Sequence, residues 1–143
     1  MQKIQGVSII ELLIVIAIGS ILAVIAIPTY QKYVLKARIS ELIGAANSYK
    51  VEMAEKILLQ DPHDINQEYQ SGSNNIDTIR LKSVGDEYVI HVNSSLMDDN
   101  NQPVLMQLVG SMQGNSLNWQ CRVDAAQKEL LPSNCIEGLV NIA

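Results

Sequence analysis

The first pattern in the chain is a long apolar run near its N-terminus. No side chain from Leu12 to Gln31 is charged, and about 20 apolar residues are what a helix needs to cross a bilayer. Pro28 lies inside this run. We expect it to kink the helix without ending it, because a neighbouring group in the membrane can satisfy the carbonyl that proline leaves unbonded. The run therefore predicts a membrane-spanning helix.

A second pattern follows without a break. From Leu35 to Ile57, apolar residues recur at alternating steps of four and three, which places them in one stripe along a helix. We therefore predict one helix from Val7 to about Leu59, ended by Asp61-Pro62. Its second half is amphipathic and needs a sheet or loop on its stripe. The stripe consists of Leu35, Ile39, Leu42, Ala46, Tyr49, Met53 and Ile57.

The rest of the chain predicts short strands joined by polar turns. Residues 60–84 form a polar connection, in which a short strand at Ile76–Leu81 is the one regular segment. Further strands are predicted at Glu87–Val92, Val104–Val109 and Leu117–Val123, where apolar and polar residues alternate best in the last. The economical fold is α+β, with the amphipathic half of the helix packed on an antiparallel sheet of three or four strands.

Composition narrows the function classes. The 143 residues carry a formal net charge of −5 at pH 7. Such a charge repels phosphate backbones, so we expect contact with nucleic acid only at a local basic patch. No Ser/His/Asp set, phosphate-binding glycine loop or metal-spaced cluster rises above chance. We therefore predict that the protein is not an enzyme and has no cofactor or metal site.

The chain has two cysteines, Cys121 and Cys135. Free thiols, metal ligands and catalytic groups are the alternatives to a disulfide. No CxxC motif accompanies the cysteines, and the two histidines, His63 and His91, suit ordinary surface or half-buried positions. One disulfide formed outside the cytoplasmic membrane fits such a pair. It would close a loop of about 15 residues and stabilise the fold by about 3 kcal/mol. It would also attach the C-terminal tail, in which we expect no strand, to the last predicted strand.

The N-terminus carries a more specific motif. A short leader with one charge, Lys3, ends at Gly6, and Glu11 is the fifth residue after it. An ordinary secretory signal is cut after its apolar segment, whereas the candidate cut here precedes that segment. The arrangement resembles the class III signal of type IV pilins. The likeness continues through IVIAIGSILAVIAIPTYQKY, whose Pro and two Tyr stand where type IVa pilins carry them, and WQCRVDAAQKELLPSNC is similar to the disulfide region of those pilins.

The resemblance to type IV pilins implies three regions. Residues 1–6 are a leader removed after Gly6, and Val7, which replaces the usual Phe, becomes the N-methylated N-terminus. Residues 7–34 are the hydrophobic transmembrane and polymerisation helix. Residues 35–143 are the globular head, made of the amphipathic half-helix, a loop, the antiparallel sheet and a C-terminal region bounded by the disulfide.

Glu11 is the candidate assembly residue. A carboxylate in a retained apolar helix costs on the order of 2.5–3.5 kcal/mol, so it usually has a partner. The α-amino group made by cleavage after Gly6 is a suitable one. On an axially shifted neighbouring subunit this amine would meet the carboxylate directly, and the resemblance implies that the contact sets subunit register. The alternative is that Glu11 lies in the headgroup layer and has little effect.

Two other features have simple interpretations. Asp98–Asn101 gathers oxygen atoms of the kind that calcium prefers, but it lacks the spacing of an EF-hand loop, so we predict a solvated hairpin turn. Tyr30 and Tyr33 suit anchors at the membrane interface better than an electron-conducting stack.

Taken with the resemblance, these features predict the structural subunit of a type IV pilus. The implied partners are the lipid bilayer, a prepilin peptidase/methylase, an inner-membrane assembly platform and other copies in a helical filament. The implied location is the inner membrane and then the surface of a Gram-negative-type bacterium, with adhesion, twitching motility or DNA uptake as filament uses.

Two alternatives to a pilus subunit stay open. A pseudopilin of a type II secretion system would share the N-terminal helix, but such proteins commonly carry calcium and lack the C-terminal disulfide, so the cysteine pair favours the pilus. The second alternative is a single-pass, membrane-anchored binding module that does not polymerise. Cleavage after Gly6 would exclude this module.

Overall fold

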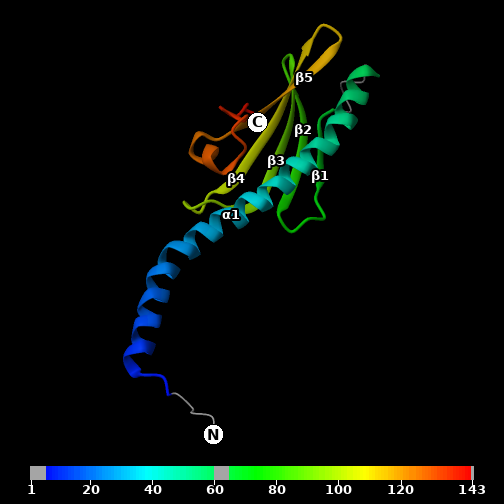
Figure 1. The fold of residues 1–143 in the computed structure, drawn as a ribbon. Coiled ribbons are helices and arrows are strands. Elements are labelled where there is room, and N and C mark those ends of the chain that lie inside the picture. Colours follow the sequence, from blue (N-terminus) through cyan, green and yellow to red (C-terminus); the bar gives the residue numbers. More distant parts are fainter. Residues whose placement is uncertain (1–5, 60–64, 143) are drawn as a thin grey trace. The chain divides into compact units, whose positions relative to one another are not determined.

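A computed structural model describes residues 6–59 and 65–142, and Figure 1 shows its elements. The chain divides into two compact units, one up to Val34 and one from Leu35 onward, and the helix α1, Ile9–Leu58, contributes to both. The predicted long helix is therefore confirmed. Residues 1–5 of the predicted leader, the Asp61-Pro62 helix stop and His63 lie outside the described residues.

The first unit is the apolar half of α1. The helix continues through Pro28, and the kink that we expect there stays a prediction. Two hydroxyl groups in this half donate to carbonyls of their own helix: Ser20 Oγ to Ile16 O at 2.6 Å and Thr29 Oγ1 to Ile25 O at 2.9 Å. Both polar side chains are thus satisfied without water, as a helix in lipid requires.

In the second unit, the amphipathic half of α1 covers one face of the sheet. The predicted stripe is confirmed along its whole length: four of its residues are fully buried, and the other three are partly buried against the same core. From the sheet, Ile79, Leu81, Ile90, Val92 and Met106 supply buried side chains to this core.

Among the described residues, the sheet has six strands in sequence order. Successive strands from β1 to β5 pair antiparallel, whereas β6 runs parallel to β5. The strands are β1 (Gln67–Gln70), β2 (Ile76–Val84), β3 (Glu87–Met97), β4 (Pro103–Gln113), β5 (Ser116–Val123) and β6 (Ile136–Glu137).

The four predicted strands correspond to β2–β5, and the two edge strands were not predicted. β1 has the sequence QEYQ and lies in the segment predicted as a polar connection. β6 is only two residues long and follows the disulfide. Between β5 and β6, residues Ala125–Leu130 form a 3-10 helix, η2, which begins after Asp124.

Two-residue hairpin loops join β2 to β3 and β4 to β5. Gly85 and Gly114 begin these loops with φ of 61° and 62°, a left-handed conformation that glycine adopts without a steric penalty and that matches the twist of the strands. The longer β3–β4 connection contains Asp98–Asn101, as predicted, and turns at Asn101 with φ 57°.

Candidate functional site

The residues predicted to be processed lie just before α1. Gly6 and Val7 are exposed, with 79% of Val7 accessible. A Cβ atom added at Gly6 would meet no atom within 4 Å. The described part of the chain therefore does not need a glycine there for its own folding.

Glu11 begins the helix together with Ser8. The Ser8 backbone N–H donates to Glu11 Oε2 at 2.9 Å, and Leu12 N donates to Ser8 O at 3.2 Å. Ser8 is the N-cap and Glu11 the third helical residue, which is the S-x-x-E spacing of a capping box. The sequence held this signal, but we did not predict the bond. The carboxylate also lies at the positive end of the helix dipole, where a negative charge is favoured.

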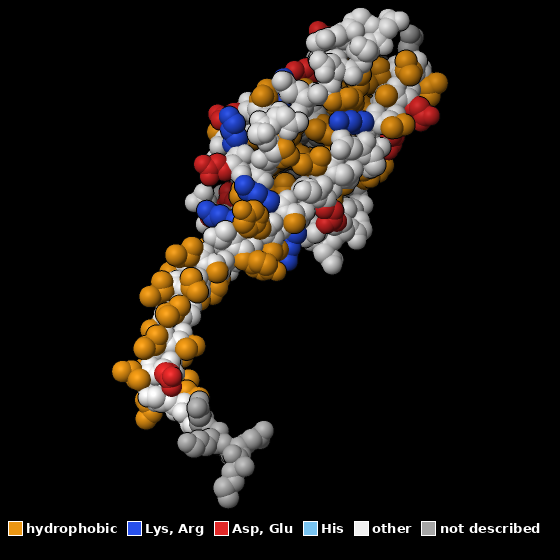
Figure 2. Space-filling model, viewed as in Figure 1, with side chains coloured by type: hydrophobic (Ala, Val, Ile, Leu, Met, Phe, Trp, Pro, Cys, Tyr) orange, Lys and Arg blue, Asp and Glu red, His pale blue; other side chains and the backbone are white. Residues whose placement is uncertain are grey.

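The apolar side chains around the first half of α1 are not covered by any other described part of the chain. Every Ile, Leu and Val side chain from Ile9 to Ile27 is at least 53% exposed, and Figure 2 shows these orange side chains along the helix. Among the residues that the structure describes, α1 is also the one helix long and apolar enough to cross a membrane. Since each such side chain gains about 1.5–3 kcal/mol from full burial, this surface needs lipid or protein around it.

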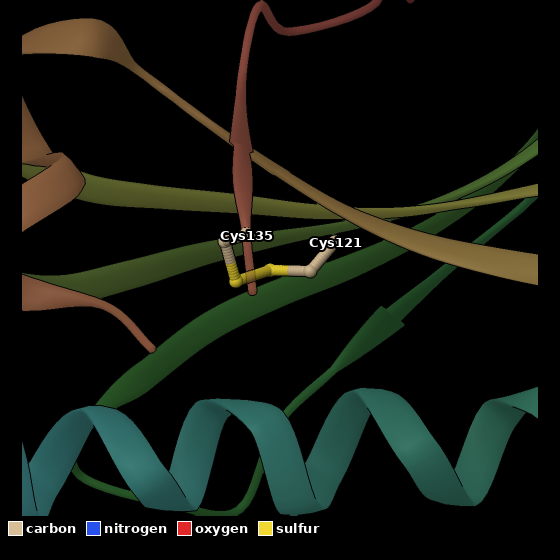
Figure 3. The surroundings of a disulfide bond; sticks show 2 residues. All are labelled: Cys121 and Cys135. Carbon is tan, nitrogen blue, oxygen red and sulfur yellow. A yellow bond between two sulfur atoms is a disulfide. The ribbon is translucent and has the colours of Figure 1, made fainter. Parts of the chain in front are cut away.

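The C-terminal part of the head is held by a disulfide. Cys121 in β5 is joined to Cys135, which directly precedes β6, and their Cα atoms are 4.5 Å apart (Figure 3). The predicted pairing is therefore present in the structure. Beyond the disulfide, Gly138 N donates to Val123 O at 3.0 Å, so the chain leaves alongside β5.

A buried glutamine fixes the loop that the disulfide closes. Gln127 of η2 is 4% exposed. Its Oε1 accepts from Leu105 N at 3.0 Å, and its Nε2 donates to Pro103 O at 2.9 Å and to Asp98 Oδ2 at 3.1 Å. The side-chain amide thus bonds the β4 backbone as a neighbouring strand would.

Asp98 stabilises the β3–β4 turn. Its Oδ1 accepts from the backbone N–H groups of Asn100 at 2.9 Å and Gln102 at 2.8 Å. These bonds, led by those to Gln102 and Gln127, lower the pKa of Asp98. Its oxygens face N–H donors, which favours the hairpin turn over calcium. Within residues 6–59 and 65–142, no group of three or more His, Cys, Asp or Glu side chains could hold a metal ion.

Two further contacts hold the β1 region against α1. The Glu41 carboxylate accepts from Ser73 and from Asn75 Nδ2 at 2.5 Å, which lowers the pKa of Glu41. In the last turn of α1, Lys56 Nζ lies 3.0 Å from Glu52 Oε1 and donates to Gln67 Oε1 at 2.8 Å. We did not predict the contacts of Glu41 with the β1–β2 connection or of Lys56 with Gln67, because each joins polar residues that are distant in sequence.

Comparison with known proteins gives matches over both units. Residues 1–27 match the family described as the prokaryotic N-terminal methylation motif, and residues 36–136 match the family described as pilin (bacterial filament). A fimbrial protein, EcpC, of Eikenella corrodens is 31% identical over 92% of this chain and 90% of its own length. The type IV major pilin protein PilE of Neisseria gonorrhoeae is 34% identical over 82% of this chain and 73% of its own. The type IV major fimbrial protein FimA of Dichelobacter nodosus is 40% identical, but over only 37% of this chain and 33% of its own.

Proposed function

The chain belongs to the pilin family of bacterial filament proteins, and we propose that it is the structural subunit of a type IV pilus. The observation that supports this function best is the uncovered apolar half of α1, preceded by Gly6, Val7 and Glu11 and joined to a head of the pilin family. Such a helix has two ways of leaving water: it inserts in a bilayer as a monomer, or it packs among copies of itself.

Processing takes place at an accessible peptide bond. Gly6 and Val7 precede the first helical residue, Ile9, and both are exposed. A prepilin peptidase can therefore cut after Gly6 without unwinding α1, and the same enzyme methylates the new amine on Val7. The demand for glycine at this position comes from the enzyme's site, because neither packing nor backbone conformation demands it here.

Glu11 changes its partner during assembly. In the uncleaved chain its carboxylate accepts from Ser8 N, a bond that reduces the free-energy cost of a charge near the membrane. Cleavage creates a positive α-amino group at Val7. When a neighbouring subunit joins with an axial shift, its amine pairs with this carboxylate and fixes the register of the two helices.

Insertion in a membrane followed by filament assembly implies a cellular location and further partners for the subunit. The subunit resides in the inner membrane of a Gram-negative-type bacterium, and an inner-membrane assembly platform adds it to the filament. The disulfide-braced head then faces water at the cell surface. Adhesion, twitching motility or DNA uptake are the filament uses that the family implies.

Filament composition and chain processing test the function directly. The gene is deleted and restored, sheared surface fibres are imaged by electron microscopy, and their subunits are analysed by mass spectrometry. We expect fibres only with the gene present, built of a subunit that begins at Val7 and is heavier by one CH₂ group. An intact Met1 terminus in the membrane would instead indicate an anchored binding module. A correctly cleaved subunit whose loss stops protein secretion but leaves fibres unchanged would indicate a pseudopilin.

A further inference from the structure

The face of the sheet that points away from α1 carries a buried polar group. His91 of β3 and Gln107 of β4 are directly opposite each other and are 7% and 1% exposed. Val89 and Val109 flank them on the same face and are also buried, although they are not part of the core against α1. The half-buried residues Leu139, Val140 and Ile142 belong to the C-terminal segment, residues 138–142, which is drawn in red in Figure 1.

Gln107 joins this segment to the sheet. Its Nε2 donates to Val140 O at 2.8 Å, and its Oε1 accepts from Val140 N at 2.7 Å. Two directly opposite residues of antiparallel strands form the same pair of hydrogen bonds, one donated and one accepted by each residue. The second hydrogen on Gln107 Nε2 points to His91 Nδ1 at 3.0 Å. The amide thus uses both of its donors.

The protonation state of His91 follows from these partners. An amide nitrogen only donates, so His91 Nδ1 accepts and the ring proton resides on Nε2. His91 Nε2 then donates to Asn93 Oδ1 at 2.7 Å, and Asn93 Nδ2 donates to Thr78 Oγ1 at 3.0 Å. One chain of hydrogen bonds therefore runs from β2 to the C-terminal segment, and it requires a neutral histidine.

One charged group beside His91, the Arg80 guanidinium, also favours the neutral form of the ring. Arg80 is its cross-strand neighbour on β2 and is paired with Glu68 on β1. On β5, Arg122 is opposite Gln107 and is paired with Glu87. The nearest cation further along β2 is Lys82, which is opposite Val89. The C-terminal segment, with the sequence Gly-Leu-Val-Asn-Ile, has no titratable side chain.

We propose that His91 and Gln107 form an acid-sensitive clasp, which holds residues 138–142 on the sheet at neutral pH and releases them when His91 is protonated. A proton on Nδ1 turns this acceptor into a donor that faces the donor Gln107 Nε2. If the amide turns over to present Oε1 to the ring, its oxygen then faces Val140 O and its nitrogen faces Val140 N. Both bonds to the segment are lost in that orientation.

The direction of the pH response follows from burial. Burial lowers the pKa of His91 below its ordinary value of 6.5, opposed by the bond to Asn93 and reinforced by the Arg80 cation. Release of the segment lets water reach the ring and returns the pKa toward that value. The closed clasp is therefore fully stable above pH 6.5 and weakens as the pH falls below it. At pH 5.0 the equilibrium constant for opening rises up to about thirtyfold.

Hydrogen exchange of the full chain in detergent micelles tests the clasp. Protection factors, corrected for the intrinsic exchange rate, are measured by mass spectrometry for the peptide that covers residues 138–142 at pH 7.5, 6.0 and 5.0. We expect protection to fall up to about thirtyfold between pH 7.5 and pH 5.0 in this peptide, while peptides from β3 and β4 keep theirs.

Three variants separate the clasp from a general effect of acid. His91→Gln should remove the pH response, and His63→Gln, which changes the only other histidine, should keep it. Val140→Pro removes the N–H donor without altering the sheet. It should show low protection at every pH, and it tests the clasp even if His91→Gln fails to fold. A wild-type segment with the same protection at pH 7.5 and 5.0, or an unchanged fall in a folded His91→Gln variant or in Val140→Pro, overturns the proposal.

Discussion

Replacing Glu11 by Leu tests how the filament selects its register. The change removes a carboxylate from the apolar segment, which should favour membrane insertion by about 2.5–3.5 kcal/mol. It also removes the acceptor of Ser8 N, a capping contact worth about 0.5–2 kcal/mol. The two terms oppose each other, so the monomer should remain inserted and correctly cleaved.

Assembly should respond differently, because in the filament the partner of the Glu11 carboxylate is a positive charge and not a backbone N–H. The neighbour's α-amino group would be left unpaired inside a bundle of apolar helices, at a cost of roughly 3–5 kcal/mol. Each subunit addition would become less favourable by a factor of about 10²–10⁴, which is enough to stop elongation. We expect a stable, processed subunit in the membrane and few or no fibres.

The assay compares the membrane subunit with surface fibres in the same cells. Immunoblots of membrane fractions measure cleaved subunit, and electron microscopy of sheared material counts fibres. Glu11→Asp keeps the charge with a shorter reach and should assemble in part. Ser8→Ala keeps the backbone N–H that bonds Glu11 and should assemble as the wild type does. Wild-type fibre numbers from Glu11→Leu would refute the pairing with a neighbour's amine.

Three further variants test processing, the disulfide and the packing of the sheet. Gly6→Trp should leave an uncleaved, membrane-bound precursor and no fibres, and cleaved subunit on an immunoblot would contradict the proposed cut. Cys121→Ser should lower the free energy of unfolding by about 3 kcal/mol and speed proteolysis within residues 125–134, and urea unfolding at the wild-type midpoint would show that the bridge does not brace the head. In Gly110→Ala the new Cβ would lie 3.0 Å from Trp119 Cζ3, so we expect a loss of about 1–3 kcal/mol; Gly72→Ala, where a Cβ meets nothing within 4 Å, is the matched control, and equal unfolding midpoints for the two variants would refute the packing argument.

The periodicity of the sequence was enough to predict the elements that bury a regular apolar face. The helical stripe that includes Ile39 and Met53 is buried as expected, and the central strands fall where alternation was strongest. β1 could not be predicted, because Tyr69 is its only apolar residue and polar contacts with Lys56 and Glu52 attach it to α1. Such contacts depend on the tertiary fold and leave no periodic signal.

In the C-terminal region, the disulfide was the one feature that the sequence predicted. The cysteine pair indicated the disulfide, but Gln107 and Gln127 look like solvent-facing polar residues in the sequence. Both are buried, because the chain after β5 folds back over β4. Gln127 of η2 then bonds the backbone of β4, and Gln107 of β4 bonds the backbone of Val140. His91 is likewise more buried than expected for the same reason. The roles of Gly6, Val7 and Glu11 stay predictions from the motif.

The bonds between Gln107 and the C-terminal segment have a consequence for sequence variation. Both of them end on main-chain atoms of Val140, so the attachment does not depend on which side chain that residue carries. Proline is the exception, because it lacks the N–H. Residues such as Asn141 are exposed beside this anchor. The surface that the segment presents can therefore change through substitution while its path over the sheet is conserved, so new surface chemistry can arise there without a new backbone fold.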